Sequence, residues 1–175
     1  MSATVSNPAE GSTPDLSCGP LALEIVRLTP SRGMALHRFF KDINASGDSH
    51  FFRPHATDEE AILKLAEYTG QDLHYVLVDN GGILGYGLLR GWDEGYKVPS
   101  LGIAVHPSAR GLGIGRMLMV FLHITACRKG AEKVRLRVHL GNDKAMHLYK
   151  SLGYIFESDS NDVEYLVGLK QLKHA

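Results

Sequence analysis

The 175-residue chain lacks the features that mark several large classes of protein. Its two cysteines form neither a metal-ligand spacing nor a disulfide framework, which fits a reducing cytosol. No segment approaches the roughly 20 apolar residues of a membrane helix. Lys+Arg and Asp+Glu total 19 each, so no global field attracts nucleic acid. We therefore expect a cytoplasmic protein with no metal, nucleic-acid or membrane partner.

The composition that is present is that of a globular domain, with 44% hydrophobic and 22% charged residues. The length suffices for one domain with a proper core, but not for two of ordinary size. Residues 1–19 are rich in Ser, Thr, Pro and Gly, and have neither the basic start nor the apolar core of a secretory signal. We expect a disordered extension over 1–19 and a single domain over 20–175.

Hydrophobic periodicity predicts an α/β chain in which strands and helices are mixed. Strands are predicted over 21–28, 72–79, 83–90, 98–105, 132–138, 153–158 and 162–169. Helices are predicted over 30–44, 57–68, 113–129 and 142–152, the second starting with a capping box at Thr57. Three consecutive strands in the middle argue against a doubly wound nucleotide-binding fold, which alternates strand and helix.

The most informative segment is a glycine-rich turn between a predicted strand and a predicted helix. Glycines alternate at Gly111, Gly113 and Gly115, and Arg110 and Arg116 flank them. The first amides of a helix are unpaired and partly positive, so this turn suits a diphosphate. It lacks the Lys-Ser/Thr of a Walker loop, and Arg116 stands where the dinucleotide fingerprint needs glycine. The simpler alternative is a tight strand–helix connection.

A second segment, 142–154, carries helix signals at both ends: Asn142 is a predicted N-cap, and Gly153 is placed to end the helix. Together the two segments resemble two signatures of the GNAT (Gcn5-related) N-acetyltransferases. The first, Arg/Gln-x-x-Gly-x-Gly/Ala, is met by Arg110, Gly113 and Gly115. The second, Asn-x-x-Ala-x-x-x-Tyr-x-x-x-Gly-Phe/Tyr, is met by Asn142, Ala145, Tyr149, Gly153 and Tyr154. The resemblance is carried by residues 98–157 and extends over 20–170.

The resemblance implies the GNAT fold, a central twisted mixed sheet flanked by helices. In that fold the fourth and fifth strands splay apart and the pantetheine arm of acetyl-coenzyme A enters between them. Main-chain groups of Ile103 and Val105 would pair with that arm, and Gly102 is read as a bulge that aims an amide at the thioester carbonyl. The implied cofactor-binding residues are Ile103, Ala104, Val105, Arg110, Gly111, Leu112, Gly113, Ile114, Gly115, Arg116, Asn142, Ala145 and Tyr149.

The implied reaction is direct attack of an amine on the thioester in a ternary complex, accelerated chiefly by holding the two together. Tyr149 is the expected general acid, because a phenol stays protonated at neutral pH and can protonate the departing thiolate. Packing of Tyr149 on the sheet is the structural alternative. Asn142 either contacts pantetheine or serves only as an N-cap.

The general base has no clear candidate. Many family members place a glutamate on the fourth strand, but residues 98–103 contain none. The candidates are Asp93 and Glu94 in the loop between the third and fourth strands, His55 in the loop before the second helix, and a water-relayed proton, and the sequence does not choose among them.

The acceptor is expected to be the primary amine of a small molecule, with amino sugars among the candidates because residues 51–55 faintly resemble family members that modify them. The predicted substrate-binding residues are Phe52, Arg53, His55, Trp92, Asp93 and Glu94, with Phe51 and Tyr96 as further lining. The neutral net charge speaks mildly against a strongly acidic acceptor. Alternatives are a peptide or protein amine and a non-catalytic acyl-coenzyme A sensor. The sequence does not decide the oligomeric state, and a homodimer is one alternative, since many GNAT proteins dimerise.

Overall fold

The computed structural model describes residues 23–47, 51–52, 54–80 and 82–172, so the extension predicted over 1–19 lies outside the described residues. The elements, in chain order, are β1 (Glu24–Arg27), the 3-10 turn η1 (Pro30–Arg32), α1 (Gly33–Ala45), α2 (Glu59–Ala66), β2 (Leu73–Asp79), β3 (Gly82–Arg90), β4 (Ser100–Val105), the 3-10 turn η3 (Pro107–Ala109), α3 (Ile114–Arg128), β5 (Lys133–His139), α4 (Asp143–Ser151), β6 (Ile155–Ser158) and β7 (Tyr165–Gln171). This confirms the predicted order of strands and helices.

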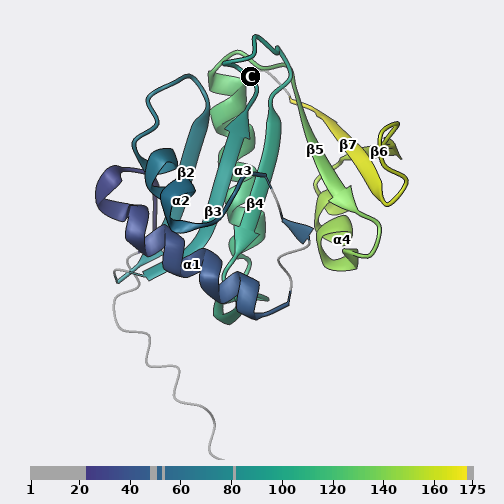
Figure 1. The fold of residues 1–175 in the computed structure, drawn as a ribbon. Coiled ribbons are helices and arrows are strands. Elements are labelled where there is room, and N and C mark those ends of the chain that lie inside the picture. Colours follow the sequence, from purple (N-terminus) through teal and green to yellow (C-terminus); the bar gives the residue numbers. More distant parts are fainter. Residues whose placement is uncertain (1–22, 48–50, 53, 81, 173–175) are drawn as a thin grey trace, which may run out of the picture.

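The strands form one mixed sheet in the order β1-β2-β3-β4-β5-β7-β6 (Figure 1). Every neighbouring pair is antiparallel except β4 and β5, which run parallel and share the single register pair Ser100–Arg135. Beyond that pair the two strands diverge, and the edge of β4 that faces β5 has no strand partner. The predicted splay between the fourth and fifth strands is confirmed.

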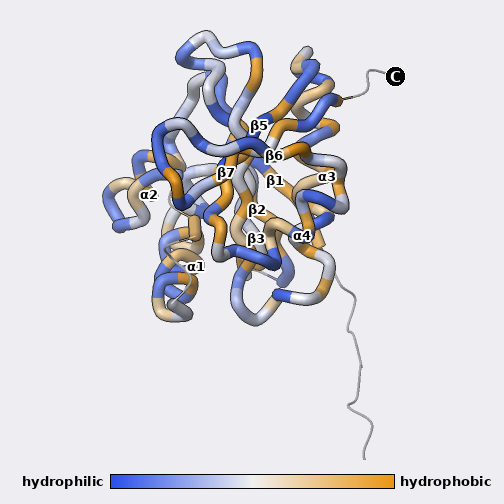
Figure 2. Tube along the Cα trace, turned by 90° about the vertical axis from the view of Figure 1, so that its right-hand side faces the viewer, coloured by the Kyte–Doolittle hydropathy of each residue, from blue (hydrophilic) through white to orange (hydrophobic). Residues whose placement is uncertain are grey.

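Helices cover the two faces of the sheet unequally. Helices α1 and α2 pack on β2, β3 and β4 through a cluster that includes Leu36, Phe40, Ile62 and Tyr86. On the other face α3 packs through Leu118, Met119 and Leu122, and β5 and α4 join that core (Figure 1). In Figure 2 the hydrophobic segments gather along the strands between these layers. No residue of β5, β6 or β7 belongs to the buried cluster under α1 and α2, within the described part of the chain.

Two local predictions are wrong. The N-cap of α2 is Asp58 and not Thr57, because the Asp58 carboxylate accepts a hydrogen bond from the Ala61 amide at 3.0 Å. There is no bulge at Gly102, because the β3–β4 register is unbroken along the whole of β4. A Cβ at Gly102 would lie 3.2 Å from the Phe52 ring, so close packing accounts for this glycine. In the described residues, no helix is both long enough and apolar enough to span a membrane.

Candidate active site

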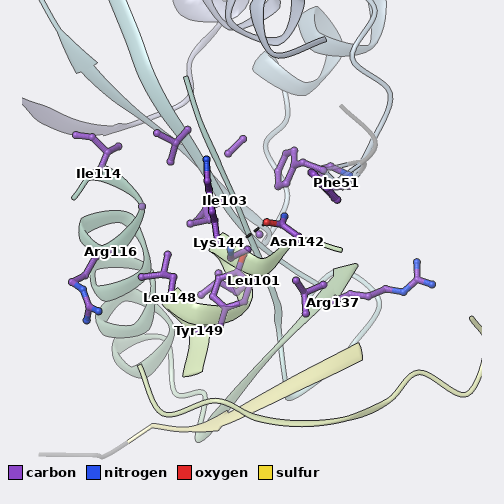
Figure 3. Close-up of a pocket in the computed structure, with 18 of the residues that line it drawn as sticks. Phe51, Leu101, Ile103, Ile114, Arg116, Arg137, Asn142, Lys144, Leu148 and Tyr149 are labelled. Carbon is purple, nitrogen blue, oxygen red and sulfur yellow. Dashed lines mark hydrogen bonds between the residues drawn. The ribbon is translucent and has the colours of Figure 1, made fainter. Parts of the chain in front are cut away.

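A cavity of about 990 Å³ opens where the pairing between β4 and β5 ends (Figure 3). Strand β4 forms its floor, the turn before α3 and the first turns of α4 form one end, and Phe51, Phe52 and Pro54 form a wall. It is lined by every predicted cofactor-binding residue except Leu112: Ile103, Ala104, Val105, Arg110, Gly111, Gly113, Ile114, Gly115, Arg116, Asn142, Ala145 and Tyr149. Leu112 lies outside it, with 71% of its surface exposed.

The turn before α3 is shaped to receive an anion. Gly113 is the N-cap of α3 with φ +81°, and its carbonyl accepts from the Met117 amide at 3.0 Å. The amides of Ile114, Gly115 and Arg116 donate to no acceptor in the described residues. These amides carry the partial positive charge of the α3 N-terminus, so a diphosphate placed there would complete their hydrogen bonds.

The three glycines of the turn serve two different purposes. Gly111 and Gly113 have φ near +80°, and a Cβ on either would meet no protein atom within 4 Å. Glycine is needed at both positions because the backbone there is left-handed, and the missing side chains leave open space above the amides of residues 114–116. Gly115 is different, since a Cβ there would lie 3.3 Å from the Leu148 side chain and 3.6 Å from that of Ile103. It lets α3 approach α4 and β4 closely.

Arg116 is held at the outer side of this turn. Its guanidinium donates to the Ser151 hydroxyl at 2.6 Å, and that hydroxyl donates to the Leu148 carbonyl at 2.7 Å. In Figure 3 the Arg116 side chain accordingly extends away from the cavity. Its positive charge still lies beside the free amides and adds to the attraction for an anion.

Helix α4 supplies a polar start and a tyrosine to the cavity. Asn142 is its N-cap, as predicted, and accepts from the Ala145 amide at 3.2 Å. Tyr149 is buried, yet it lines the cavity, and its hydroxyl hydrogen-bonds to no other described residue. By contrast, the hydroxyl of the neighbouring Tyr154 is bonded to His123 at 2.8 Å. Burial raises the pKa of Tyr149 to about 12, so its hydroxyl stays protonated at neutral pH.

His55 does not line the cavity. Its Nδ1 is 2.8 Å from the Ala56 carbonyl, which can only accept, so Nδ1 carries the hydrogen. In the neutral ring Nε2 then accepts from the Tyr86 hydroxyl at 3.0 Å, and the Tyr86 oxygen accepts from His74 at 2.8 Å. Burial lowers the pKa of His55. Its basic nitrogen is thus engaged inside the protein.

Of the other residues predicted to bind the acceptor, some line the cavity and some do not. Phe51 and Phe52 line the cavity, whereas Arg53 lies outside the described residues. The loop between β3 and β4 does not reach the cavity, and this loop carries Trp92, Asp93, Glu94 and Tyr96. Asp93 accepts from the Gln71 amide at 2.9 Å, and Trp92 packs under the Lys129 ammonium at 4.6 Å. Asp93 and Trp92 therefore contact the segments just before β2 and just after α3, outside the cavity.

Several cavity residues were missed by sequence reasoning: Arg90, Ser100, Arg135, Arg137, Lys144, His147 and Tyr165. For two of them, Arg135 and Arg137, the sequence pattern did carry a signal. The alternation of 132–138 puts Val134 and Leu136 in the core, which directs Arg135 and Arg137 to the opposite face of the strand that borders the opening.

Comparison with known proteins identifies the family. The model of the acetyltransferase (GNAT) family matches residues 37–154. This chain belongs to the GNAT family. GNAT proteins use acetyl-coenzyme A, and the free amides in the first turn of α3 fit its diphosphate. No group of three or more His, Cys, Asp or Glu that could hold a metal occurs in the described part of the chain.

Individual GNAT relatives agree with this assignment. A GNAT protein of Kribbella flavida has 25% identity and a TM-score of 0.69, covering 86% of this chain and 98% of its own. The fold also matches YncA of Salmonella typhimurium, solved with acetyl-CoA, at 19% identity and a TM-score of 0.68, covering 88% and 96%. Mycothiol acetyltransferase of Streptomyces coelicolor is 33% identical over 101 residues, 57% of this chain and 31% of that protein. The chain thus spans about a third of that relative's length.

Proposed function

We propose that this GNAT protein transfers an acetyl group from acetyl-coenzyme A to the primary amine of a small molecule, by direct attack in a ternary complex. The observation that carries the proposal is one continuous cavity, lined both by the first turn of α3 with its free amides and by Tyr149, whose hydroxyl has no hydrogen-bond partner among the described residues. A site that only binds the coenzyme has no use for a proton donor at that place.

Acetyl-coenzyme A supplies an activated thioester, so the protein has mainly to bind, orient and move protons. The amides at 114–116 hold the diphosphate, and the unpaired edge of β4 aligns the arm that carries the acetyl group. An amide on that edge stabilises the negative charge that develops on the carbonyl oxygen. A bond forms between the amine nitrogen and the carbonyl carbon, the C–S bond breaks, and Tyr149 gives its proton to the sulfur.

The incoming amine must also lose a proton, and we assign that proton to water. Asp143 is the one carboxylate and His147 the one histidine among the described lining residues, and both lie on α4 beside the proposed coenzyme site. None of the residues on the acceptor side, among those described, is an ordinary base of neutral pH.

A tyrosine-to-phenylalanine pair tests the proposal. Thiol release is followed over a panel of small amines, amino sugars and peptides with the wild type, Tyr149→Phe and Tyr154→Phe. We expect kcat to fall about 100-fold or more in Tyr149→Phe, the scale of one general acid. Tyr154→Phe is the matched control, because it removes a hydroxyl that is bonded in the core, and it should lower stability but not kcat.

Each result is informative. Undiminished turnover in Tyr149→Phe removes this residue from the mechanism. If no amine releases thiol while acetyl-coenzyme A still raises the melting temperature, the protein is a sensor of the coenzyme. Turnover confined to peptides identifies a peptide or protein amine as the acceptor.

A further inference from the structure

The end of the cavity opposite the glycine turn is crossed by a row of three residues on adjacent strands. Arg90 of β3 pairs with Ser100 of β4, and Ser100 pairs with Arg135 of β5. Directly paired residues project to the same face of a sheet, and all three line the cavity. The row lies five residues along β4 from Val105, about 16 Å at the usual rise. It therefore belongs to the acceptor side.

The charge around this cavity is one-sided. Six lining residues are Lys or Arg and a single one, Asp143, is acidic, among the residues the structure describes. Half of these cations come from the turn before α3 and the starts of α3 and α4: Arg110, Arg116 and Lys144. The other half, Arg90, Arg135 and Arg137, come from β3 and β5. The zero net charge of the chain conceals this local excess, so it does not argue against an anionic acceptor.

The three arginines on β3 and β5 differ in their partners. Arg137 donates to Asp159 and, at 2.7 Å, to Asp162, and it stacks on the Tyr165 ring at 3.8 Å. In Figure 3 its side chain extends away from the cavity. Its charge is thus satisfied within the protein.

Arg90 and Arg135 are not ion-paired in this way. Arg90 donates to the carbonyl of Pro54, a neutral group. Within the described residues, neither guanidinium forms an ion pair with a carboxylate. The carboxylate of Asp159 acts on Arg135 electrostatically, but it already forms an ion pair with Arg137. Two cations without an ion pair of their own, on one row beside an aromatic wall, form a site for an anion, because a guanidinium binds carboxylate or phosphate through two parallel hydrogen bonds.

We propose that Arg135, assisted by Arg90 and the Ser100 hydroxyl, binds an anionic group of the acceptor, a carboxylate or a phosphate. The inference rests on the proposed function, since it names the class of amine that the site accepts. Ile103, whose main chain is expected to align the coenzyme, lies three residues from this row, about 10 Å along β4. Acceptors that fit carry the amine and the anion several bonds apart, as a dipeptide or an amino-sugar phosphate does.

The test uses amines that differ only in a remote charge. The pairs are glucosamine 6-phosphate with glucosamine, and dialanine with dialaninamide, so phosphate and carboxylate are tested separately. Each is assayed for kcat/KM with the wild type, Arg135→Gln, Arg135→Lys and Lys133→Gln. Lys133 is the matched control, because it is two residues from Arg135 on the same face of β5 and does not line the cavity.

We expect the wild type to prefer at least one anionic partner by about 10-fold or more, the effect of a hydrogen bond to a charged group. Arg135→Gln should lose 10- to 100-fold, roughly, with that partner and stay within about 2-fold with the neutral one. Arg135→Lys should recover part of the loss, and Lys133→Gln should keep the wild-type preference. No preference in the wild type, or equal losses with both partners in Arg135→Gln, overturns the inference while leaving the transferase in place.

A binding measurement separates this inference from the proposed function. Each amine is added to the coenzyme A-loaded protein and the melting temperature is recorded. We expect the anionic amine to raise it in the wild type and in Lys133→Gln but not in Arg135→Gln. If the wild type turns over no amine, the proposed function fails, and this binding measurement alone then tests the anion site. A rise that depends on Arg135 then supports the anion site, and its absence overturns it.

Discussion

Replacing Gly113 by valine tests whether the turn before α3 holds the coenzyme. Gly113 has φ +81° and open space where a Cβ would project, so valine adds no clash with the protein. It adds backbone strain of about 1–2 kcal/mol, because an L-residue in the left-handed region crowds its own carbonyl. It also places a branched side chain above the free amides, in the volume assigned to the diphosphate.

The size of the effect follows from mass action. Acetyl-coenzyme A at 100 times its dissociation constant stabilises the folded chain by about 2.7 kcal/mol. In a chain of this length that stabilisation raises the melting temperature by about 5–11 °C. If the valine weakens binding 100-fold, the remaining stabilisation is about 0.4 kcal/mol, a rise of only about 1–2 °C.

Gly130→Val is the matched control for Gly113→Val. Gly130 has φ +89°, has no protein atom within 4 Å of a built Cβ, and follows the other end of α3, away from the cavity. Thermal melts with and without acetyl-coenzyme A should show that both variants are destabilised to a similar extent. The ligand-induced rise should persist in Gly130→Val and nearly vanish in Gly113→Val. An equal rise in the two variants would refute the assignment of the turn.

Two further predictions concern pH. Burial lowers the pKa of His74 and of His123 to about 4, from 6.5, so the unfolded chain binds more protons between these values. The free energy of unfolding should therefore fall as the pH drops below about 6.5, by about 2 kcal/mol per histidine at pH 5. Urea unfolding of the wild type and His123→Gln measures this, and equal pH slopes would contradict it. With water as the proton acceptor, kcat/KM should rise about tenfold per pH unit up to the pKa of each amine. A plateau at one pH for amines of different basicity would instead reveal a base in the protein.

The turn before α3 could be predicted from the sequence because its requirements are local. A left-handed residue at Gly113, a free helix start after it and an N-cap at Asn142 are each set by a few neighbouring residues. Element order was predictable for the same reason, since periodicity reports which side of each segment is buried. The reading of Gly102 as a bulge was wrong because close packing and irregular pairing leave the same mark, a glycine in a strand.

The acceptor side was less predictable because long-range pairing assembles it. Trp92, Asp93 and Glu94 were assigned there by analogy with loops that wall such pockets. Their loop does join Arg90 to Ser100, but none of its own residues lines the cavity. His55 is close in the sequence to Phe52, which does line the cavity. Its ring instead turns into the core, where Tyr86 on another element holds it.

The amino-acid sequence by itself determined the family, the order of the elements and the glycine turn with its free helix start, because local backbone conformation and periodicity are properties of neighbouring residues. Only the tertiary structure decided which arginines face the acceptor. That choice depends on Ser100 pairing with Arg135 across 35 positions of the chain, and on Asp159 and Asp162 neutralising Arg137. Strand register is fixed by the packing of the whole sheet, which no short segment encodes.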